Sequence, residues 1–305
     1  MKRLLLLLPF ALLATVNEPF CWELSSGYRT DEIHWHSSQD ASSSMYTEKY
    51  DNVQFWENAL SFRVIHRDLM FFIAGGYSAF GNGTLQQQFT GLPFTNDTPQ
   101  FNFTTNGFAA DGTGYFGYAV NLTADRTYKV LLIPLFGFSG HFAKLNRRGT
   151  SVVETSSYQM SSTLPKSLEQ TWYGIYLGAG VRIQPVGRLI FDVGYAYHWL
   201  HAKLSTHFAE SVALPTPSSS FTQSNNLTAS AGGNHGHSGW AKMECIASAA
   251  WRVGAASTIN YFPSRVLNVQ QKQTTTPPGS TASLSSKFKL RWTSISVLFT
   301  VSRDI

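Results

Sequence analysis

The sequence is poor in charge and in cysteine. Charged residues make up 13% of the 305 residues, against about a quarter in most soluble proteins, and the two cysteines are Cys21 and Cys245. Two cysteines do not form a disulfide framework, and Cys245 falls on the outer face of a predicted strand, so we expect no bridge. Setting Lys2 and Arg3 aside with the leader leaves 21 basic and 18 acidic residues, a net charge of +3. This gives no reason to expect a nucleic-acid partner.

Long apolar runs are also missing beyond the first residues. No stretch of about eighteen apolar residues follows Leu13, which excludes a membrane-spanning helix. The opening "MKRLLLLLPFALLA" has two basic residues, a short apolar run and then small residues, the pattern of a secretory signal peptide. We predict a signal peptide over residues 1–17, with cleavage between 14 and 21, and a single domain over 18–305. Acylation of Cys21 is disfavoured because Pro19 and Phe20 make a poor lipoprotein signal.

Aromatic residues and glycines are plentiful, yet the mean hydropathy is only −0.11. Alternation explains how a high aromatic content coexists with a low mean hydropathy, because apolar residues at every second position are averaged with the polar residues between them. In "TWYGIYLGAGVRIQ" the odd positions from Tyr173 to Ile183 are apolar or aromatic, whereas the even ones carry glycine, Tyr176 and Arg182. After residues 185–187 the alternation resumes from Leu189 to Trp199. Two long strands joined by a tight turn predict a β-hairpin.

The same alternation recurs along the chain. It appears over residues 56–64, 69–77, 114–122, 128–142 and 240–261, and single strands are predicted at 22–36 and 287–301. In the last of these, Phe288 and Trp292 share one phase while Ile295 and Phe299 share the other, which predicts a β-bulge near Thr293. The count is about ten strands, an even number as closed bacterial barrels require.

The connections between these strands alternate strictly in length. Short turns are predicted near 66–68, 124–127, 184–187 and 253–256, and long segments rich in Ser, Thr, Asn, Gly and Pro at 38–50, 82–112, 146–170, 206–238 and 270–284. Short periplasmic turns and long extracellular loops are typical of outer-membrane barrels. We therefore predict an all-β fold, a transmembrane antiparallel up-and-down β-barrel of about ten strands.

A soluble β-sandwich is the alternative, and three features disfavour it. The predicted strands run for ten residues or more, where about five or six is usual in a globular protein. Aromatic residues end the apolar faces, as in the interfacial girdles of membrane barrels; these are Tyr173, Tyr197, Trp199, Trp240 and Trp251. The opposite faces carry glycine and charge, where a sandwich would bury aliphatic residues from both sheets.

Charged and polar residues on the inner faces are the candidate lumen-lining set. Two interpretations stay open: a salt-bridged plug that fills the barrel, or a thin water-filled path whose excess of bases favours anions. Pairing Ile183 with Leu189 places Arg182 diagonally near Asp192, within reach of an ion pair. The candidate lumen-lining residues are Glu57, Arg63, Lys129, His141, Arg182, Asp192, His198, Lys242, Glu244, Arg252, Lys287, Lys289 and Arg291.

Two histidine pairs were considered as metal ligands. "EIHWH" offers His34 and His36, and "NHGHSGW" offers His235 and His237 on a predicted loop. Two histidines spaced by two residues are a weak signal, and neither pair has an evident third ligand in the sequence. We expect exposed polar residues at both places, and hence no metal and no cofactor.

The element order carries a family resemblance. "GYRTDEIHWH" at 27–36 and "FWENALSFRV" at 55–64, followed by paired long strands, resemble the omptin-like ten-stranded barrels and, among them, the Protochlamydia outer membrane protein family of porin-like proteins. The resemblance implies the outer membrane of a Gram-negative bacterium of the Chlamydiae. Omptin proteases use an Asp-x-Asp and an Asp-x-His pair. Neither pattern occurs in this sequence, and Asp97 and Asp111 stand alone, so we predict no catalytic residues and no enzymatic activity.

The sequence thus predicts a porin-like barrel that lets small hydrophilic solutes diffuse through a narrow lumen. The alternative is a non-conducting structural or adhesin barrel that acts through its long extracellular loops. Outer-membrane lipid is the expected surrounding, and lipopolysaccharide and host surfaces are the candidate partners of the loops. Oligomeric state is left open.

Overall fold

The computed structural model is an all-β molecule. It describes residues 20–38, 45–90, 98–123, 128–149, 151–154, 159–162, 166–185, 187–213, 220–263, 267–276 and 280–305. The predicted signal peptide lies outside these residues. No helix in the described part of the chain is long and apolar enough to cross a membrane.

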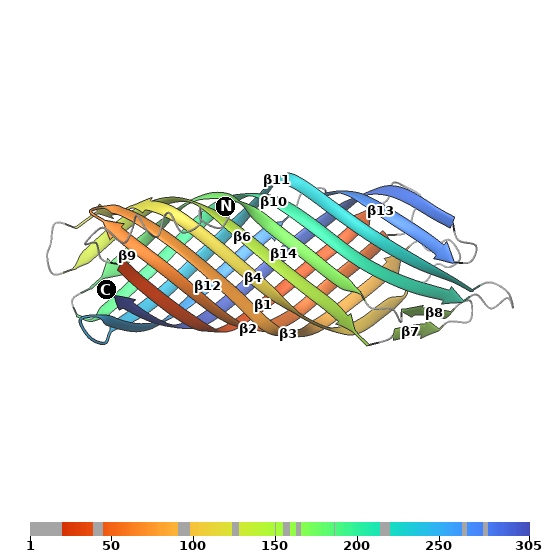
Figure 1. The fold of residues 1–305 in the computed structure, drawn as a ribbon, viewed down its shortest axis with the longest axis horizontal. Coiled ribbons are helices and arrows are strands. Elements are labelled where there is room, and N and C mark those ends of the chain that lie inside the picture. The colour runs from red at the N-terminus through yellow and green to blue at the C-terminus, as the bar shows by residue number, and fades with distance from the viewer. Residues whose placement is uncertain are drawn as a thin grey trace, which may run out of the picture.

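Fourteen strand segments make up the described sheet (Figure 1). They are β1 (Phe20–Ser38), β2 (Met45–His66), β3 (Leu69–Thr90), β4 (Gln100–Tyr118), β5 (Val120–Asn121), β6 (Lys129–Arg148), β7 (Ser151–Glu154), β8 (Gln159–Ser162), β9 (Ser167–Gln184), β10 (Leu189–Ala213), β11 (Ser220–Ile246), β12 (Trp251–Pro263), β13 (Leu267–Thr276) and β14 (Ser280–Asp304).

The sheet closes on itself as a barrel of ten strands within the described residues. β4 with β5, and β12 with β13, are each one interrupted barrel strand, while β7 and β8 form a small hairpin outside the ring. β1 pairs antiparallel with β14 from Cys21↔Asp304 to Ser38↔Lys287, which joins the first strand to the last. Closure leaves no open sheet edge, and a sheet in lipid requires this because its backbone N–H and C=O groups must all be paired. The predicted barrel is confirmed.

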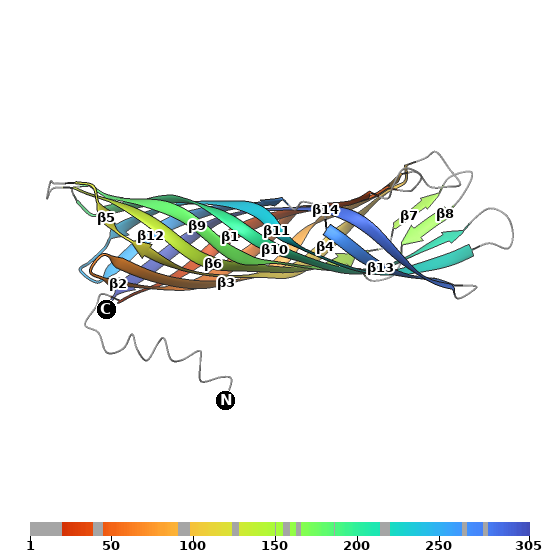
Figure 2. The same cartoon turned by 90° about the horizontal axis from the view of Figure 1, so that it is seen from above.

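The two ends of the barrel differ, as the view from above in Figure 2 shows. At one end, here called the turn end, the strands are joined by short connections such as that between His66 and Leu69, and the C-terminus lies there. The other is here called the loop end, and the strands β10 and β11 that reach it are 25 and 27 residues long in total. About ten tilted residues suffice to cross a bilayer, so the strands extend well beyond a membrane at the loop end.

An apolar belt surrounds the outside of the turn-end half. Its side chains point away from the barrel and are at least about one-third exposed, and every barrel strand contributes to it. Alternation produces it, because successive side chains of a strand point to opposite faces. Representative members, one from each barrel strand in order, are Leu24, Leu60, Ile73, Phe116, Phe138, Leu177, Val193, Met243, Ile259 and Val297.

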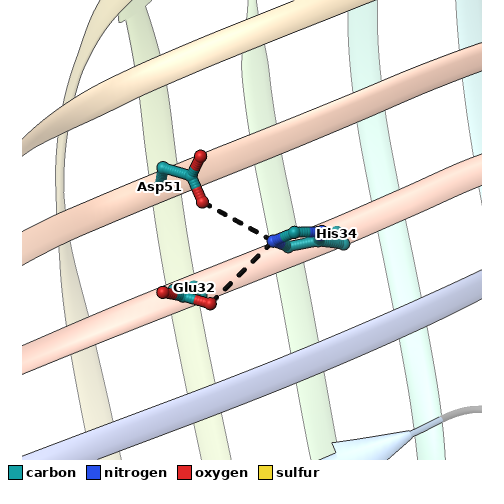
Figure 3. Close-up of side chains that lie close together, drawn as sticks. All are labelled: Glu32, His34 and Asp51. Carbon is teal, nitrogen blue, oxygen red and sulfur yellow. Dashed lines mark ion pairs between the residues drawn. The ribbon is translucent and has the colours of Figure 1, made fainter.

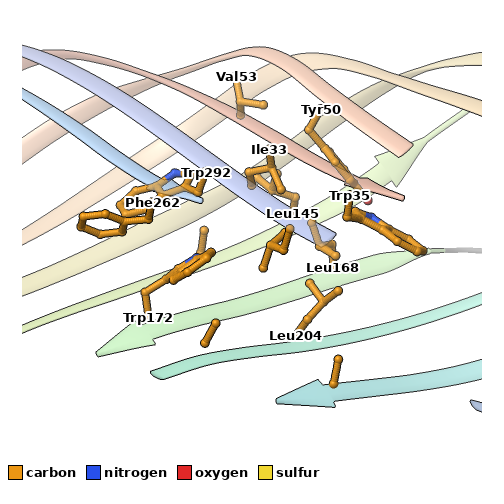
Figure 4. Packing of buried hydrophobic residues seen from close by; sticks show 14 of the residues in the cluster. Ile33, Trp35, Tyr50, Val53, Leu145, Leu168, Trp172, Leu204, Phe262 and Trp292 are labelled. Carbon is orange, nitrogen blue, oxygen red and sulfur yellow. The ribbon is translucent and has the colours of Figure 1, made fainter. Parts of the chain in front are cut away.

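The polarity of the wall reverses in the loop-end half, where apolar side chains point inward. They form one contiguous cluster, here called the inner core, to which every barrel strand contributes (Figure 4). Trp35, Trp172 and Phe262 within it have no exposed surface, so no water-sized path reaches them. Members from the ten barrel strands in order are Ile33, Tyr50, Leu85, Phe101, Leu145, Trp172, Leu204, Leu227, Phe262 and Trp292.

This reversal corrects the predicted bulge near Thr293. β14 pairs with β1 without any register shift, and Thr293 lies directly opposite Glu32. Phe288 and Trp292 point into the inner core, whereas Ile295, Val297 and Phe299 point outward into the belt. The apolar residues of β14 switch from inward to outward positions because the medium outside the barrel changes from water to lipid. The strand itself does not slip by a residue.

Two predictions about connections were also wrong. The turn predicted at 253–256 lies at 247–250, where the Ser248 hydroxyl accepts the backbone N–H groups of Ala250 and Trp251. Gly254 lies within β12, where a Cβ would collide with the carbonyl oxygen of Met243, so its role is close strand approach. The long segments predicted as loops are largely strands within the described residues, and their inward-facing side chains include members of the inner core such as Leu85, Phe101 and Leu227.

The turn at 66–68 is confirmed, and the turn at 184–187 falls between β9 and β10 as expected, with residue 186 outside the described part. The turn at 124–127 also lies outside the described residues. In the β9–β10 hairpin the register differs from the prediction by two residues, because Ile183 pairs with Phe191.

Candidate functional site

A cavity of about 340 Å³ lies inside the barrel, below the inner core and within the belt. It extends from Glu23 and Arg63 near the turn end to Arg29 and His141, where Phe262 and Trp292 of the inner core cover it. The strands place these side chains here because the inward phase of the belt region carries the residues that lipid would exclude.

The structure separates the predicted lumen-lining residues into three groups. Those that line the cavity are Glu57, Arg63, His141, Arg182, Asp192, His198 and Lys242. Glu244 and Arg252 point inward nearer the turn end, where Glu244 bonds Lys242 and Arg252 pairs with Asp304. The prediction is wrong for Lys287, Lys289 and Arg291, which point outward because the adjacent Phe288, Leu290 and Trp292 occupy the inner core; Lys129 is exposed at the turn-end rim.

These placements remove the expected excess of bases. The cavity lining contains four bases, Arg29, Arg63, Arg182 and Lys242, and four carboxylates, Glu23, Glu57, Asp111 and Asp192. Two further buried carboxylates, those of Asp31 and Glu244, bond cavity bases directly. The wall is therefore charge-balanced or slightly acidic, and the predicted anion preference loses its basis.

The charges near the turn end are held in pairs across neighbouring strands. Arg182 faces Asp192 directly, with Nε to Oδ1 at 2.7 Å and Nη2 to Oδ2 at 2.9 Å, so the predicted ion pair is confirmed, opposite and not diagonal. Lys242 pairs with Glu23 of β1 and bonds Glu244 at 3.0 Å. Such pairs offset the cost of carrying charge inside a membrane.

A buried charged network forms the roof of the cavity. The Arg29 guanidinium bonds both carboxylate oxygens of Asp31, at 2.7 and 2.9 Å, and also pairs with Asp111. His141 lies 2.6 Å from Asp111 through Nδ1, and the Trp292 indole donates to Asp31 at 3.1 Å. The carboxylate of Asp111 is an acceptor, so Nδ1 carries the proton, and Nε2 is buried without a hydrogen-bond partner.

Sequence reasoning missed most of this network. Asp111 does not stand alone in a loop as predicted, because it lies in β4 opposite His141 of β6. Arg29 and Asp31 share the inward phase of β1, and that phase was the available signal. Their partners come from β4, β6 and β14, which no local pattern identifies.

His198 forms a second polar contact beside this roof. Its Nδ1 lies 3.1 Å from the Ser139 hydroxyl, and its ring packs on Tyr176 at a centroid distance of 4.9 Å. Trp240, predicted to lie in the outer girdle, points inward instead and packs near Tyr176, in agreement with the inward phase of Lys242 on the same strand. The cavity is therefore partly aromatic as well as charged.

The predicted histidine pairs both lie on strands. His235 and His237 belong to β11 and not to a loop, and they contact Tyr197 and Tyr195 on the outer face. His34 of β1 has two carboxylate neighbours above the belt, Glu32 and Asp51 (Figure 3). Asp51 comes from β2, so its proximity to His34 could not be read from the sequence, and His36 is not part of this group. The two cysteines are free.

Comparison with known proteins agrees with the architecture. The outer membrane protease OmpT from Escherichia coli superposes with a TM-score of 0.66 at 9% identity, covering 95% of this chain and 99% of that chain. The toluene transporters TodX of Pseudomonas putida and TbuX of Ralstonia pickettii superpose at TM-scores of 0.33 and 0.32, at 9% and 8% identity. They cover 96% and 95% of this chain and 91% and 90% of their own. No curated protein sequence matches the chain.

The sequence match decides the family. The family described as Protochlamydia outer membrane protein matches residues 23–305, which is nearly the whole chain and covers all or most of every described barrel strand. The likeness to OmpT independently supports the omptin-like ten-stranded barrel. The chain belongs to the Protochlamydia outer membrane protein family, a family of outer-membrane β-barrels.

Proposed function

We propose that the protein is a porin-like outer-membrane barrel whose lumen is closed, in the conformation described here, by its inner core. The charged cavity of about 340 Å³ inside the apolar belt carries this proposal. Charged side chains inside a membrane are costly and generally face water or a solute pathway. A barrel with a purely structural role could fill the same interior space with aliphatic side chains.

The inner core acts as the gate in this proposal. Constrictions lined by hydrophobic side chains close channels by excluding water, and small shifts that hydrate them restore conduction. Phe262 is central, because its ring contacts His141, Trp172 and Trp292 at centroid distances between 5.0 and 5.9 Å. Short turns of outer-membrane barrels face the periplasm, so the cavity lies on the periplasmic side of this gate.

Planar-bilayer recording tests the proposal. We expect wild-type protein to give infrequent conductance steps, and the double variant Phe262→Ala/Trp292→Ala to give frequent ones. Since the cavity wall has balanced charge, the open path should favour neither anions nor cations strongly. A reversal potential measured in a salt gradient reports this directly.

The matched control is Phe299→Ala, a truncation of a belt residue that is 60% exposed. It should leave the frequency of steps at the wild-type value. Each variant is first checked for folding by its heat-dependent shift on a denaturing gel. A folded double variant that gives no conductance steps over several preparations would refute the pore. We also propose that the protein is not an enzyme.

A non-conducting surface barrel is the second candidate, and the length of β10 and β11 favours it. These strands stay paired from Leu189↔Cys245 to Ala213↔Ser220, far beyond the belt. Replacing residues 207–226 with an Asn-Gly turn would shorten the loop end and keep the belt. If this candidate holds, the variant loses attachment of the bacterium to host cells but keeps its barrel fold. Unchanged attachment would refute it.

A further inference from the structure

We propose that Glu32, His34 and Asp51 form a zinc-binding site on the outer surface of the barrel, just above the apolar belt. The three side chains come from the adjacent strands β1 and β2 and converge on one point (Figure 3). Neither the porin-like function nor its alternative requires this site, so its test is independent of both.

The geometry is close to that of a metal site before the ion enters. One ligand atom from each residue lies within 4.8 Å of the others, and His34 Nε2 is 3.6 Å from Asp51 Oδ1 and 4.0 Å from Glu32 Oε2. Two ligands held at about 2.1 Å from a tetrahedral zinc ion are roughly 3.4 Å apart. Both His34 distances exceed this value by less than 1 Å, so side-chain rotations can complete the site, and water fills the remaining position.

A β-bulge places Asp51 in the site. Asp31 pairs with Val53 and Ile33 with Tyr50, so β2 has one extra residue between these pairs. Asn52 takes up the extra length with a φ of +50°, a conformation that non-glycine residues seldom adopt. Bulges redirect side chains, and this one turns Asp51 toward His34 on the neighbouring strand.

His34 is a suitable ligand. Its Nε2 is shielded from solvent and has no hydrogen-bond partner, although it points between two carboxylates. The neutral imidazole is the form that binds zinc. One nitrogen and two carboxylate oxygens suit a borderline ion such as zinc.

Two cations compete with a bound metal. Lys49 pairs with Asp51, and Arg291 Nη2 lies 3.1 Å from His34 Nδ1. The guanidinium can only donate, so Nε2 carries the proton in the metal-free protein. On zinc binding that proton moves to Nδ1, and Arg291 and Lys49, both partly exposed, turn to water. The net proton count of the imidazole is unchanged.

Titration calorimetry of the purified mature protein in detergent, with zinc sulfate and no chelator, tests the site. We expect His34→Ala to lose one zinc equivalent and Asp51→Asn to weaken binding by about 10- to 100-fold, as losses around metal sites do. His36→Ala is the matched control, a histidine two residues away on the same face, and should bind as the wild type does. Zinc held by other surface histidines remains in every variant and is subtracted.

Removing the competing cations should act in the opposite direction. Arg291→Gln and Lys49→Gln should each tighten zinc binding by about two- to fivefold, the effect expected of one exposed charge. A purely structural cluster predicts no such gain. The proposal is overturned if His34→Ala keeps the wild-type stoichiometry and affinity, if His36→Ala loses the same equivalent, or if neither cation variant strengthens binding. Conductance is unchanged in all of these variants, which separates this test from that of the pore.

Discussion

The indole Nε1–H of Trp292 on β14 donates to Asp31 Oδ2 on β1 at 3.1 Å, and this bond joins the inner core to the charged roof of the cavity. Both residues are essentially unexposed. Asp31 also holds the Arg29 guanidinium, which packs over the Trp292 ring with Cζ 5.5 Å from the centroid. Hydrogen bonds and ring contacts thus fix the boundary between the apolar inner core and the charged cavity.

Trp292→Phe should destabilise the barrel. The variant keeps an aromatic ring in the inner core but leaves the Asp31 carboxylate without one of its donors, a loss of about 1.5–3 kcal/mol for a hydrogen bond to a charged group. Urea unfolding in lipid vesicles, followed by the fluorescence of the remaining tryptophans, measures this. Trp56→Phe, a change at a half-exposed belt position, should cost much less. Equal losses would mean that the Asp31 bond contributes nothing.

Ile175→Arg should prevent stable insertion into the membrane. Ile175 points outward from the belt, and a basic side chain near the bilayer midplane costs about 2–4 kcal/mol. The comparison needs an inward position that tolerates a long side chain. Gly178 does not, because a Cβ there would press on the Tyr195 carbonyl, Leu135 and Ala196. Gly76 does, since it lies opposite the inward-facing Asp111 and a Cβ there would meet no atom closer than 3.4 Å.

We therefore expect Gly76→Arg to insert like the wild type and Ile175→Arg to remain outside the membrane fraction. Insertion is measured by the heat-dependent gel shift after refolding into vesicles. Similar failure of both variants would contradict the assignment of inner and outer faces.

Gly254→Ala should weaken the pairing of β11 with β12. A methyl group at this position would meet the Met243 carbonyl and Glu244, and forcing extra atoms into a packed site costs about 1–3 kcal/mol. Gly140→Ala is the matched control, since its Cβ would have no neighbour within 4 Å. The difference between their urea midpoints measures the effect. A control as unstable as Gly254→Ala would show that strand propensity, and not crowding, decides.

Strand number and barrel closure could be predicted from the sequence because lipid imposes a simple rule. Positions from Tyr173 to Ile183 and from Leu189 to Trp199 must be apolar at every second residue, and this alternation is visible without a structure. The candidate site was harder to predict. The predicted lumen set was right at Arg182 and Asp192 in the belt region, and wrong at Lys289 and its neighbours, where the outer medium is water.

The sequence by itself determined that this chain is a closed outer-membrane barrel with a polar inner face, since hydrocarbon on one side of a strand dictates what each residue can be. Only the tertiary structure decided where that rule stops. An apolar residue at every second position looks the same whether it faces lipid or an inner core, so the reversal at Thr293 resembled a bulge. Contacts such as Arg29 with Asp111, and His34 with Asp51, depend on strand register and closure, which bring together residues that no local pattern connects.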